Sequence, residues 1–267
     1  MYAEKMKIPL TAYTLFSGSS GNSVFVTCGT TSILIDAGRS ARAVETSLRE
    51  VGTDIKSIEA IFITHEHSDH IAGLEIISKK HKIPIHMTDP SANRVLRHHT
   101  YTPTVTETHP PIYECCVGDL RIQSFPIPHD SAMNVGYIIS AQSGEKLGIA
   151  TDIGYVTPII EQSLLGCEQV ILESNHDVDM LLEGPYPYYL KQRILSPYGH
   201  LSNTHCAELA CKLAASGTKS LTLAHLSRDN NEPALALNTT IHTLFQSGCE
   251  SGQVKIQVAP SDIVTLV

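Results

Sequence analysis

The stretch ITHEHSDHIAG, residues 63–73, concentrates ionisable side chains at the end of an apolar run: His65, Glu66, His67, Asp69 and His70. Burying such groups without partners costs about 2–7 kcal/mol each, and more for a charge. Imidazole and carboxylate are ligands for zinc, manganese or iron. In an extended segment His65 and His67 point the same way, and a turn directs Asp69 and His70 toward a second point. The pattern H-x-H-x-D-H therefore predicts a site for two ions, which two-metal hydrolases hold ~3.5–4 Å apart.

Two ions need more ligands than one loop supplies, and three further candidates follow apolar, strand-like runs. His129 ends FPIPH, Asp152 follows GIAT and His225 follows LTLA. Strand ends are where α/β folds gather functional side chains. A carboxylate can give one oxygen to each of two cations, so Asp152 is the best suited of the three to bridge them.

The elements that must position these residues alternate between strands and helices, which predicts an α/β fold. Apolar β-rich runs predict strands within residues 11–18, 22–29, 31–38, 60–65, 120–129, 146–154, 169–174 and 220–227. Helical patterns cover residues 40–52, 70–82 and 202–217, the last with a Ser or Asn N-cap and Gly217 as its stop. Residues 183–203 are expected to form a long ordered loop with a short helix. No linker or repeat divides the sequence, which favours a single domain over residues 1–267.

Composition favours a protein of the cytoplasm. Apolar residues make up 42% of the chain, and no apolar run is long enough for a membrane span or a signal peptide. The seven cysteines are odd in number and irregular in spacing, so we interpret them as unpaired packing residues. We expect no membrane association. The sequence gives no basis for inferring an obligate protein partner, and a homo-oligomer stays possible. The net charge of −8 is unusual for a nucleic-acid enzyme, although bound cations and a local basic patch can reverse the field in a cleft.

The order of these motifs resembles the metallo-β-lactamase superfamily over nearly the whole chain. The resemblance includes Asp36 in ILIDAG, then H-x-H-x-D-H, and then the three later ligands. It implies an αββα sandwich with two divalent ions, zinc or manganese or else iron, at one edge. By this resemblance one metal is held by His65, His67, His129 and Asp152, and the other by Asp69, His70, Asp152 and His225. Asp36 would orient a ligand from behind.

The stretch GHLSNTHCAELA points to one reaction within that superfamily. It is similar to the segment of RNase Z-type nucleases in which a histidine contacts the scissile phosphate, and this aligns His200 with that role. The alternative is that His200 only caps the helix or is exposed. SGSSGNS, ESNHD and GPYPYYLKQRILSPYGHLSN resemble the YycJ/WalJ/VicX group of bacterial proteins. That resemblance implies a DNA exonuclease running 5′ to 3′. We expect its nucleophile to be a metal-bound hydroxide, formed from a water molecule that Asp69 would orient or deprotonate.

Further residues are candidates for contacts with the substrate. Ser19 and Asn22 lie in a glycine-permissive loop that is either a phosphate rim or only a hairpin turn. Lys191 and Arg193 would contact backbone phosphates or remain solvated, and His176 would reach the groove or be structural. The tyrosines in this region are interpreted as loop anchors rather than as stacking platforms for a base: Tyr186, Tyr188 and Tyr189.

Two other classes of function compete with the nuclease. One is a small-molecule hydrolase, either a cyclic phosphodiesterase or a thioesterase of the glyoxalase II type. The other is a non-enzymatic regulator, against which the complete ligand set argues. The histidine in the G-H-L-S turn favours phosphodiester chemistry, because a phosphodiester needs a positive group near its developing charge and an acid for the departing oxygen.

Overall fold

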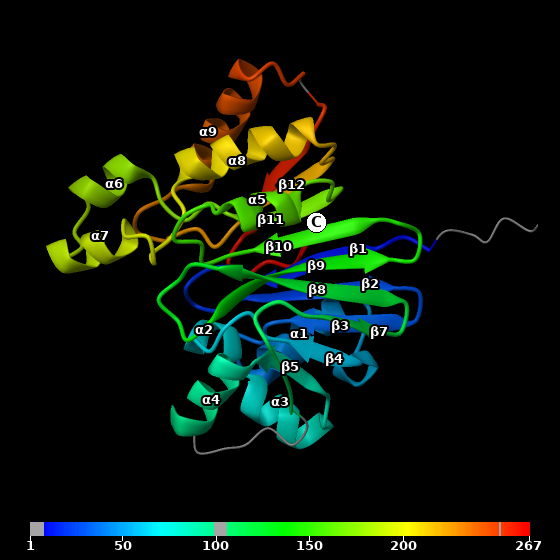
Figure 1. Cartoon of the computed structure of the whole chain (residues 1–267). Coiled ribbons are helices and arrows are strands. Elements are labelled where there is room, and N and C mark those ends of the chain that lie inside the picture. Colours follow the sequence, from blue (N-terminus) through cyan, green and yellow to red (C-terminus); the bar gives the residue numbers. More distant parts are fainter. Residues whose placement is uncertain (1–7, 99–105, 251) are drawn as a thin grey trace, which may run out of the picture.

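The computed structural model describes residues 8–98, 106–250 and 252–267, which form two facing mixed sheets flanked by helices (Figure 1). The first sheet has the order β14-β1-β2-β3-β4-β5-β6, with bounds Thr265–Leu266, Thr11–Phe16, Ser23–Cys28, Thr31–Ile35, Ala60–Phe62, Ile85–Thr88 and Thr106–His109. The second has the order β13-β12-β11-β10-β9-β8-β7, with bounds Lys255–Val258, Ser220–Ala224, Gln169–Glu173, Lys146–Ala150, Asn134–Ala141, Leu120–Ile127 and Glu114–Val117.

Helices cover the outer face of each sheet and complete an αββα sandwich. Those of the first half are α1 (Ala41–Glu50), α2 (Ser68–Ile71), α3 (Leu74–His81) and α4 (Asp89–His98). Those of the second half are α5 (Pro158–Leu164), α8 (Asn203–Ala215) and α9 (Pro233–Gln246), whereas α6 (Val178–Glu183) and α7 (Tyr188–Ile194) project beyond the edge of the sandwich (Figure 1). The predicted fold class and all eight predicted strands are confirmed.

Strands buried on both faces explain the long apolar runs in the sequence. Ile33 and Ile35 of β3 point into the core between the sheets, whereas Leu34 points into the core beneath the helices of the first sheet. In β11, Ile171 faces the inter-sheet core and Leu172 faces the helices of the second sheet. A strand covered on both sides needs apolar residues at every position rather than at alternate ones.

Parallel strands bring the site residues to one edge. β3, β4 and β5 run parallel in the first sheet, and β10, β11 and β12 run parallel in the second. Their carboxyl ends therefore meet at common edges, and the segments that follow them carry the candidate ligands. In Figure 1 this edge of the sandwich lies near α2, on the left.

Two helix predictions have different outcomes. The helix over 202–217 is confirmed as α8, with the Ser202 hydroxyl accepting the His205 N–H and Gly217 at φ 103° after its end. The helix over 70–82 is broken into α2 and α3. Its break is at Gly73, whose N–H donates to the Ala37 carbonyl at 2.8 Å and where a Cβ would lie 2.3 Å from the Arg39 carbonyl oxygen. The close approach of the 37–39 loop therefore interrupts the helix.

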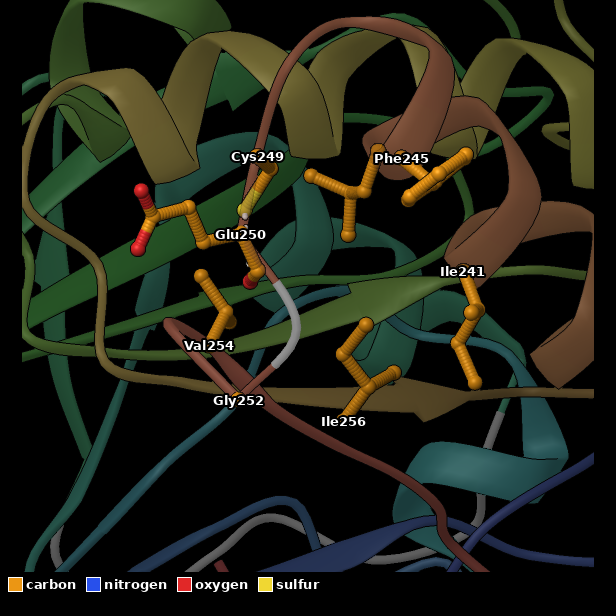
Figure 2. Close-up of a pocket in the computed structure, with 8 residues that line it drawn as sticks. Ile241, Phe245, Cys249, Glu250, Gly252, Val254 and Ile256 are labelled. Carbon is orange, nitrogen blue, oxygen red and sulfur yellow. Dashed lines mark hydrogen bonds between the residues drawn. The ribbon is translucent and has the colours of Figure 1, made fainter.

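An apolar pocket of about 240 Å³ lies at the outer edge of the second sheet, between α9 and β13 (Figure 2). Ile241 and Phe245 of α9 face Val254 and Ile256 across it. It contains none of the predicted site residues. In the described ranges, every helix is too short or too polar to traverse a lipid bilayer.

Candidate metal centre

All seven predicted ligands converge on one cluster. Three overlapping groups have ligand atoms within 4.8 Å of one another: His65, His67 and His129; His65, His70 and Asp152; and Asp69, His70 and His225. Shared members join these groups into a continuous array. Taken as whole residues, His65, His70, Asp152 and His225 are at most 2% exposed, so the array is mostly buried.

Several buried ligand atoms in this array have no hydrogen-bond partner within the described part of the chain. They are Nε2 of His65, Nε2 of His225 and Oδ2 of Asp152. Leaving such atoms unpaired would cost free energy, and their types are those that divalent transition ions prefer. The donor set therefore fits divalent cations.

Hydrogen bonds behind the ligands fix which ring nitrogen faces the cluster. His65 Nδ1 contacts the Thr64 hydroxyl at 3.1 Å, and His129 Nδ1 donates to the Gly199 carbonyl at 3.1 Å. His70 Nδ1 lies 2.8 Å from Asp36 Oδ2, which leaves its Nε2 beside the candidate ligand Asp152. Each ring thus presents Nε2 to the cluster, the arrangement by which metal proteins orient histidine ligands.

Asp36 lies behind the ligands rather than among them. Its Oδ1 accepts the Thr64 N–H at 2.8 Å, and its Oδ2 accepts the Thr64 hydroxyl and the Nδ1–H of His70. Burial raises the pKa of Asp36, and the facing His70 opposes that shift. This position agrees with the orienting role that the resemblance implies.

Asp69 sits at the more open side of the array. Its Oδ2 lies 3.5 Å from His70 Nε2 and 3.8 Å from His225 Nε2, and it accepts a hydrogen bond from the Asn22 amide at 3.2 Å. Burial opposes ionisation of Asp69, but the nearby His225 and His70 rings hold its pKa below the usual value. The carboxylate is therefore ionised at neutral pH.

A buried carboxylate that the sequence analysis missed, Glu173, ties the later part of the site together. Its Oε1 lies 2.7 Å from His225 Nδ1 and 2.9 Å from His200 Nδ1. Its Oε2 accepts the N–H groups of Ile153 at 2.6 Å and Leu201 at 3.0 Å. Burial alone would raise the pKa of Glu173, but the two facing imidazoles lower it to about 2. Its signal in the sequence was a carboxylate at the end of the run QVIL, the same signal that identified Asp152.

His200 lies among the ligands and is more open than the buried ones. Its ring centroid is 5.1 Å from that of His129 and 5.2 Å from that of His225. Its side chain is 20% exposed, against 3% for His225. It does not cap α8, because Ser202 does so. A ring oriented by Glu173 and reachable from solvent can act on a bound substrate.

Three of these residues have left-handed backbone conformations that side-chain-bearing residues rarely adopt. The φ angles are 61° at Asp36, 59° at Asp152 and 57° at His225. Each residue directly follows a buried strand or lies two positions beyond it. Such conformations store strain of order 1–3 kcal/mol, which the surrounding structure must hold in place.

The candidate substrate residues of the N-terminal loop and of ESNHD have different environments. Ser19 is exposed at the tip of its loop. Asn22 is buried, and its amide holds Asp69 while its oxygen accepts the Gly18 N–H. His176 is 1% exposed, and burial lowers its pKa to about 4, so it does not present a ring to the groove.

The cations of α7, and the tyrosines in α7 and just before it, only partly meet expectation. Lys191 donates to the Leu182 carbonyl, and Arg193 forms an ion pair with Asp130 at 2.5 Å. Tyr186 anchors its loop through a hydrogen bond to Asp229, as predicted. The anchoring interpretation is wrong for Tyr188 and Tyr189, which are 77% and 75% exposed. Both project from α7 into solvent, and none of the seven residues of α7 is fully buried.

Comparisons with known proteins agree with this geometry. Residues 31–225 match the model of the beta-lactamase superfamily domain. The chain is 34% identical over 240 residues to exodeoxyribonuclease YycJ of Bacillus anthracis, covering 90% of each chain. It is also 34% identical over 237 residues to exodeoxyribonuclease WalJ of Streptococcus pneumoniae, covering 87% of each chain.

A solved structure supports the same fold. The metallo-beta-lactamase fold protein YhfI of Bacillus subtilis superposes with a TM-score of 0.70 at 17% identity, covering 98% of this chain and 100% of that one. At this identity the likeness concerns the fold alone. Taken with the domain match and the two exodeoxyribonuclease relatives, it confirms that the chain belongs to the beta-lactamase superfamily and has the metallo-β-lactamase fold.

Proposed function

We propose that this protein is a metal-dependent exodeoxyribonuclease that hydrolyses DNA from its 5′ end. The observation that carries the proposal is the His200 ring, which is held by Glu173 within the ligand cluster and open to solvent. Relatives that are named exodeoxyribonucleases and match about nine-tenths of the chain support it. The 5′ polarity follows from the resemblance to the YycJ/WalJ/VicX group.

Two divalent ions, zinc or manganese or else iron, would occupy the cluster. His65, His67 and His129 would hold one ion, Asp69, His70 and His225 the other, and Asp152 would bridge them. When bound, such ions polarise the phosphoryl group and lower the pKa of coordinated water. The unpartnered Nε2 atoms and the buried Asp152 oxygen support this assignment.

The chain's own residues would move the protons. The Asp69 carboxylate, ionised and on the open side of the cluster, would orient the attacking water and accept its proton. Glu173 accepts the Nδ1–H of His200, so the other ring nitrogen, Nε2, is left to face the substrate. That nitrogen would donate a proton to the departing oxygen or stabilise the charge that grows on the phosphoryl oxygens.

A DNA substrate is consistent with a location in the cytoplasm, which we also propose. All seven cysteines are free thiols, as expected in a reducing compartment.

End-labelled DNA tests the proposal directly. Metal-loaded protein is incubated with single- and double-stranded DNA and with RNA of matched sequence, and the products are resolved over time. We expect 5′-labelled DNA to release its label first as short products, and chelation to stop the reaction. A preparation that cleaves bis(p-nitrophenyl) phosphate but leaves linear DNA intact at low salt would reduce the function to a small-molecule phosphodiesterase. Hydrolysis of a thioester alone would identify a thioesterase.

A further inference from the structure

A shallow, cationic hollow of about 290 Å³ lies beside the loop that carries His65 and His67, called the metal loop below. Its lining residues are Pro90, Asn93, Arg94 and Arg97 of α4 and Ala132 of the loop that follows His129. Arg94 and Arg97 are both exposed. Residues three apart on a helix share a face, so the two guanidinium groups project from the same side of α4.

Glu66, the residue between His65 and His67, fixes this hollow relative to the cluster. Its Oε1 accepts the Ala132 N–H at 2.7 Å, and its Oε2 accepts the Ser91 hydroxyl at 2.9 Å. Ser91 also lies 3.0 Å from the carbonyl of Met133. One buried carboxylate thus joins the metal loop, the first turns of α4 and the 128–133 loop. The hollow is therefore rigidly placed next to the ligands.

The guanidinium groups in the hollow are only weakly neutralised. Arg94 Nε lies 3.7 Å from Glu66 Oε1, an oxygen that already accepts a short hydrogen bond. Arg97 has no acidic partner among residues 8–98, 106–250 and 252–267. By contrast, Lys191 and Arg193 of α7 are engaged by Leu182 and Asp130. Free guanidinium N–H groups in a chain of net charge −8 favour an anionic ligand here.

We propose that this hollow binds the backbone phosphates of the DNA strand next to the scissile phosphate. This inference rests on the proposed nuclease function and specifies where the strand runs. Guanidinium groups bind phosphate oxygens in a bidentate manner, and such contacts position a strand without reading its sequence. α4 lies toward the same edge of the sandwich as α2 (Figure 1), so a strand with one phosphate at the cluster can pass over the hollow.

The test compares long and minimal substrates in the full-length, metal-loaded protein. The double variant R94Q/R97Q should lower kcat/KM on single-stranded DNA on the order of tenfold at low salt, because two charged groups no longer bind phosphate. It should also make the plot of log DNA affinity against log salt concentration less steep. The slope should change by about 0.7 unit for each phosphate contact that the variant loses. Hydrolysis of bis(p-nitrophenyl) phosphate, which is too short to reach the hollow, should stay unchanged, as should the metal content. R94K/R97K should recover part of the activity on DNA.

A matched control removes two positive charges at the far end of the strands. Lys219 directly precedes β12, whereas His225 follows it, and Lys255 begins the neighbouring β13. K219Q/K255Q should leave DNA hydrolysis unchanged. Equal rates on DNA for both double variants would overturn the inference. An equal loss of activity on DNA and on bis(p-nitrophenyl) phosphate, reproduced by the single variant R97Q, would also overturn the inference. The arginines would then only support the loop that carries His65 and His67. Failure of the wild-type protein to digest DNA would instead defeat the proposed function.

Discussion

The substitution Glu173→Gln tests whether a single buried carboxylate orients both His200 and His225. Each oxygen of Glu173 accepts two hydrogen bonds, one pair from the imidazoles and the other from the N–H groups of Ile153 and Leu201. An amide has the same shape but replaces one acceptor with a donor. Whichever way it turns, its NH₂ group faces two donors, so two of the four hydrogen bonds cannot form.

The magnitude follows from these hydrogen bonds. Those to a charged group contribute about 1.5–3 kcal/mol each, so the two that cannot form are worth roughly 3–6 kcal/mol. Part of this cost lowers the free energy of unfolding. The part that acts through His225 should weaken metal affinity on the order of 10–100-fold. The part that acts through His200 should lower kcat/KM on DNA by about 10²–10⁴-fold at saturating metal.

The assay separates these contributions. Metal content is measured after dialysis, kcat/KM is measured at saturating metal, and thermal unfolding is followed with and without metal. Glu161→Gln provides the control, since Glu161 is a surface residue paired with Lys212. At saturating metal, adding E173Q to H200A should cost little more than H200A alone, because the two residues act as one unit. Fully additive losses, or E173Q activity within about threefold of wild type, would refute the reasoning.

Three further perturbations have defined outcomes. His200→Ala should keep its metals and its fold yet lose about 10²–10⁴ in kcat/KM; loss of metal by this variant, seen by elemental analysis, would make His200 a ligand instead. Reconstituted protein should hold close to two equivalents of metal, and chelation should lower its unfolding temperature. Asp69→Ala should lower the metal stoichiometry. One equivalent in both the wild type and this variant contradicts a binuclear site. The pKa of His176 is about 4 in the folded protein, against an ordinary value of 6.5, so between these pH values the unfolded chain binds a proton that the folded chain does not. The free energy of unfolding should therefore fall by up to ~3 kcal/mol as the pH drops from 6.5 to 4. His176→Leu should flatten that part of the pH dependence in denaturant titrations at fixed metal; an unchanged slope rules out His176 as its source.

The proposed ligands could be identified in the sequence because their signal is local. Asp152 and His225 each follow a buried strand within two positions, and the apolar run and the polar residue are adjacent in the sequence. Glu173 carries the same signal but was overlooked. Its partners, His200 and His225, lie 27 and 52 positions away, and no local pattern reveals that they converge on it.

Contacts between distant segments explain the other differences. The sequence showed that Lys191 and Arg193 precede His200, but not that Leu182 and Asp130 would occupy their donors. The arginine hollow has the same origin. Glu66 helps to hold α4 against the 128–133 loop, a tertiary contact with no sequence motif.

The left-handed backbone at Asp36, Asp152 and His225 has a consequence for how such a protein evolves. Glycine, and to a lesser degree asparagine, adopts this conformation at lower cost, so substitutions to these residues would relieve part of the strain. An inactive descendant with glycine at position 152 would therefore fold at least as readily without metal. Cellular quality control, which removes destabilised chains, would not eliminate it. Only selection on the reaction itself retains these side chains, so lineages relieved of that selection should lose activity before they lose the fold.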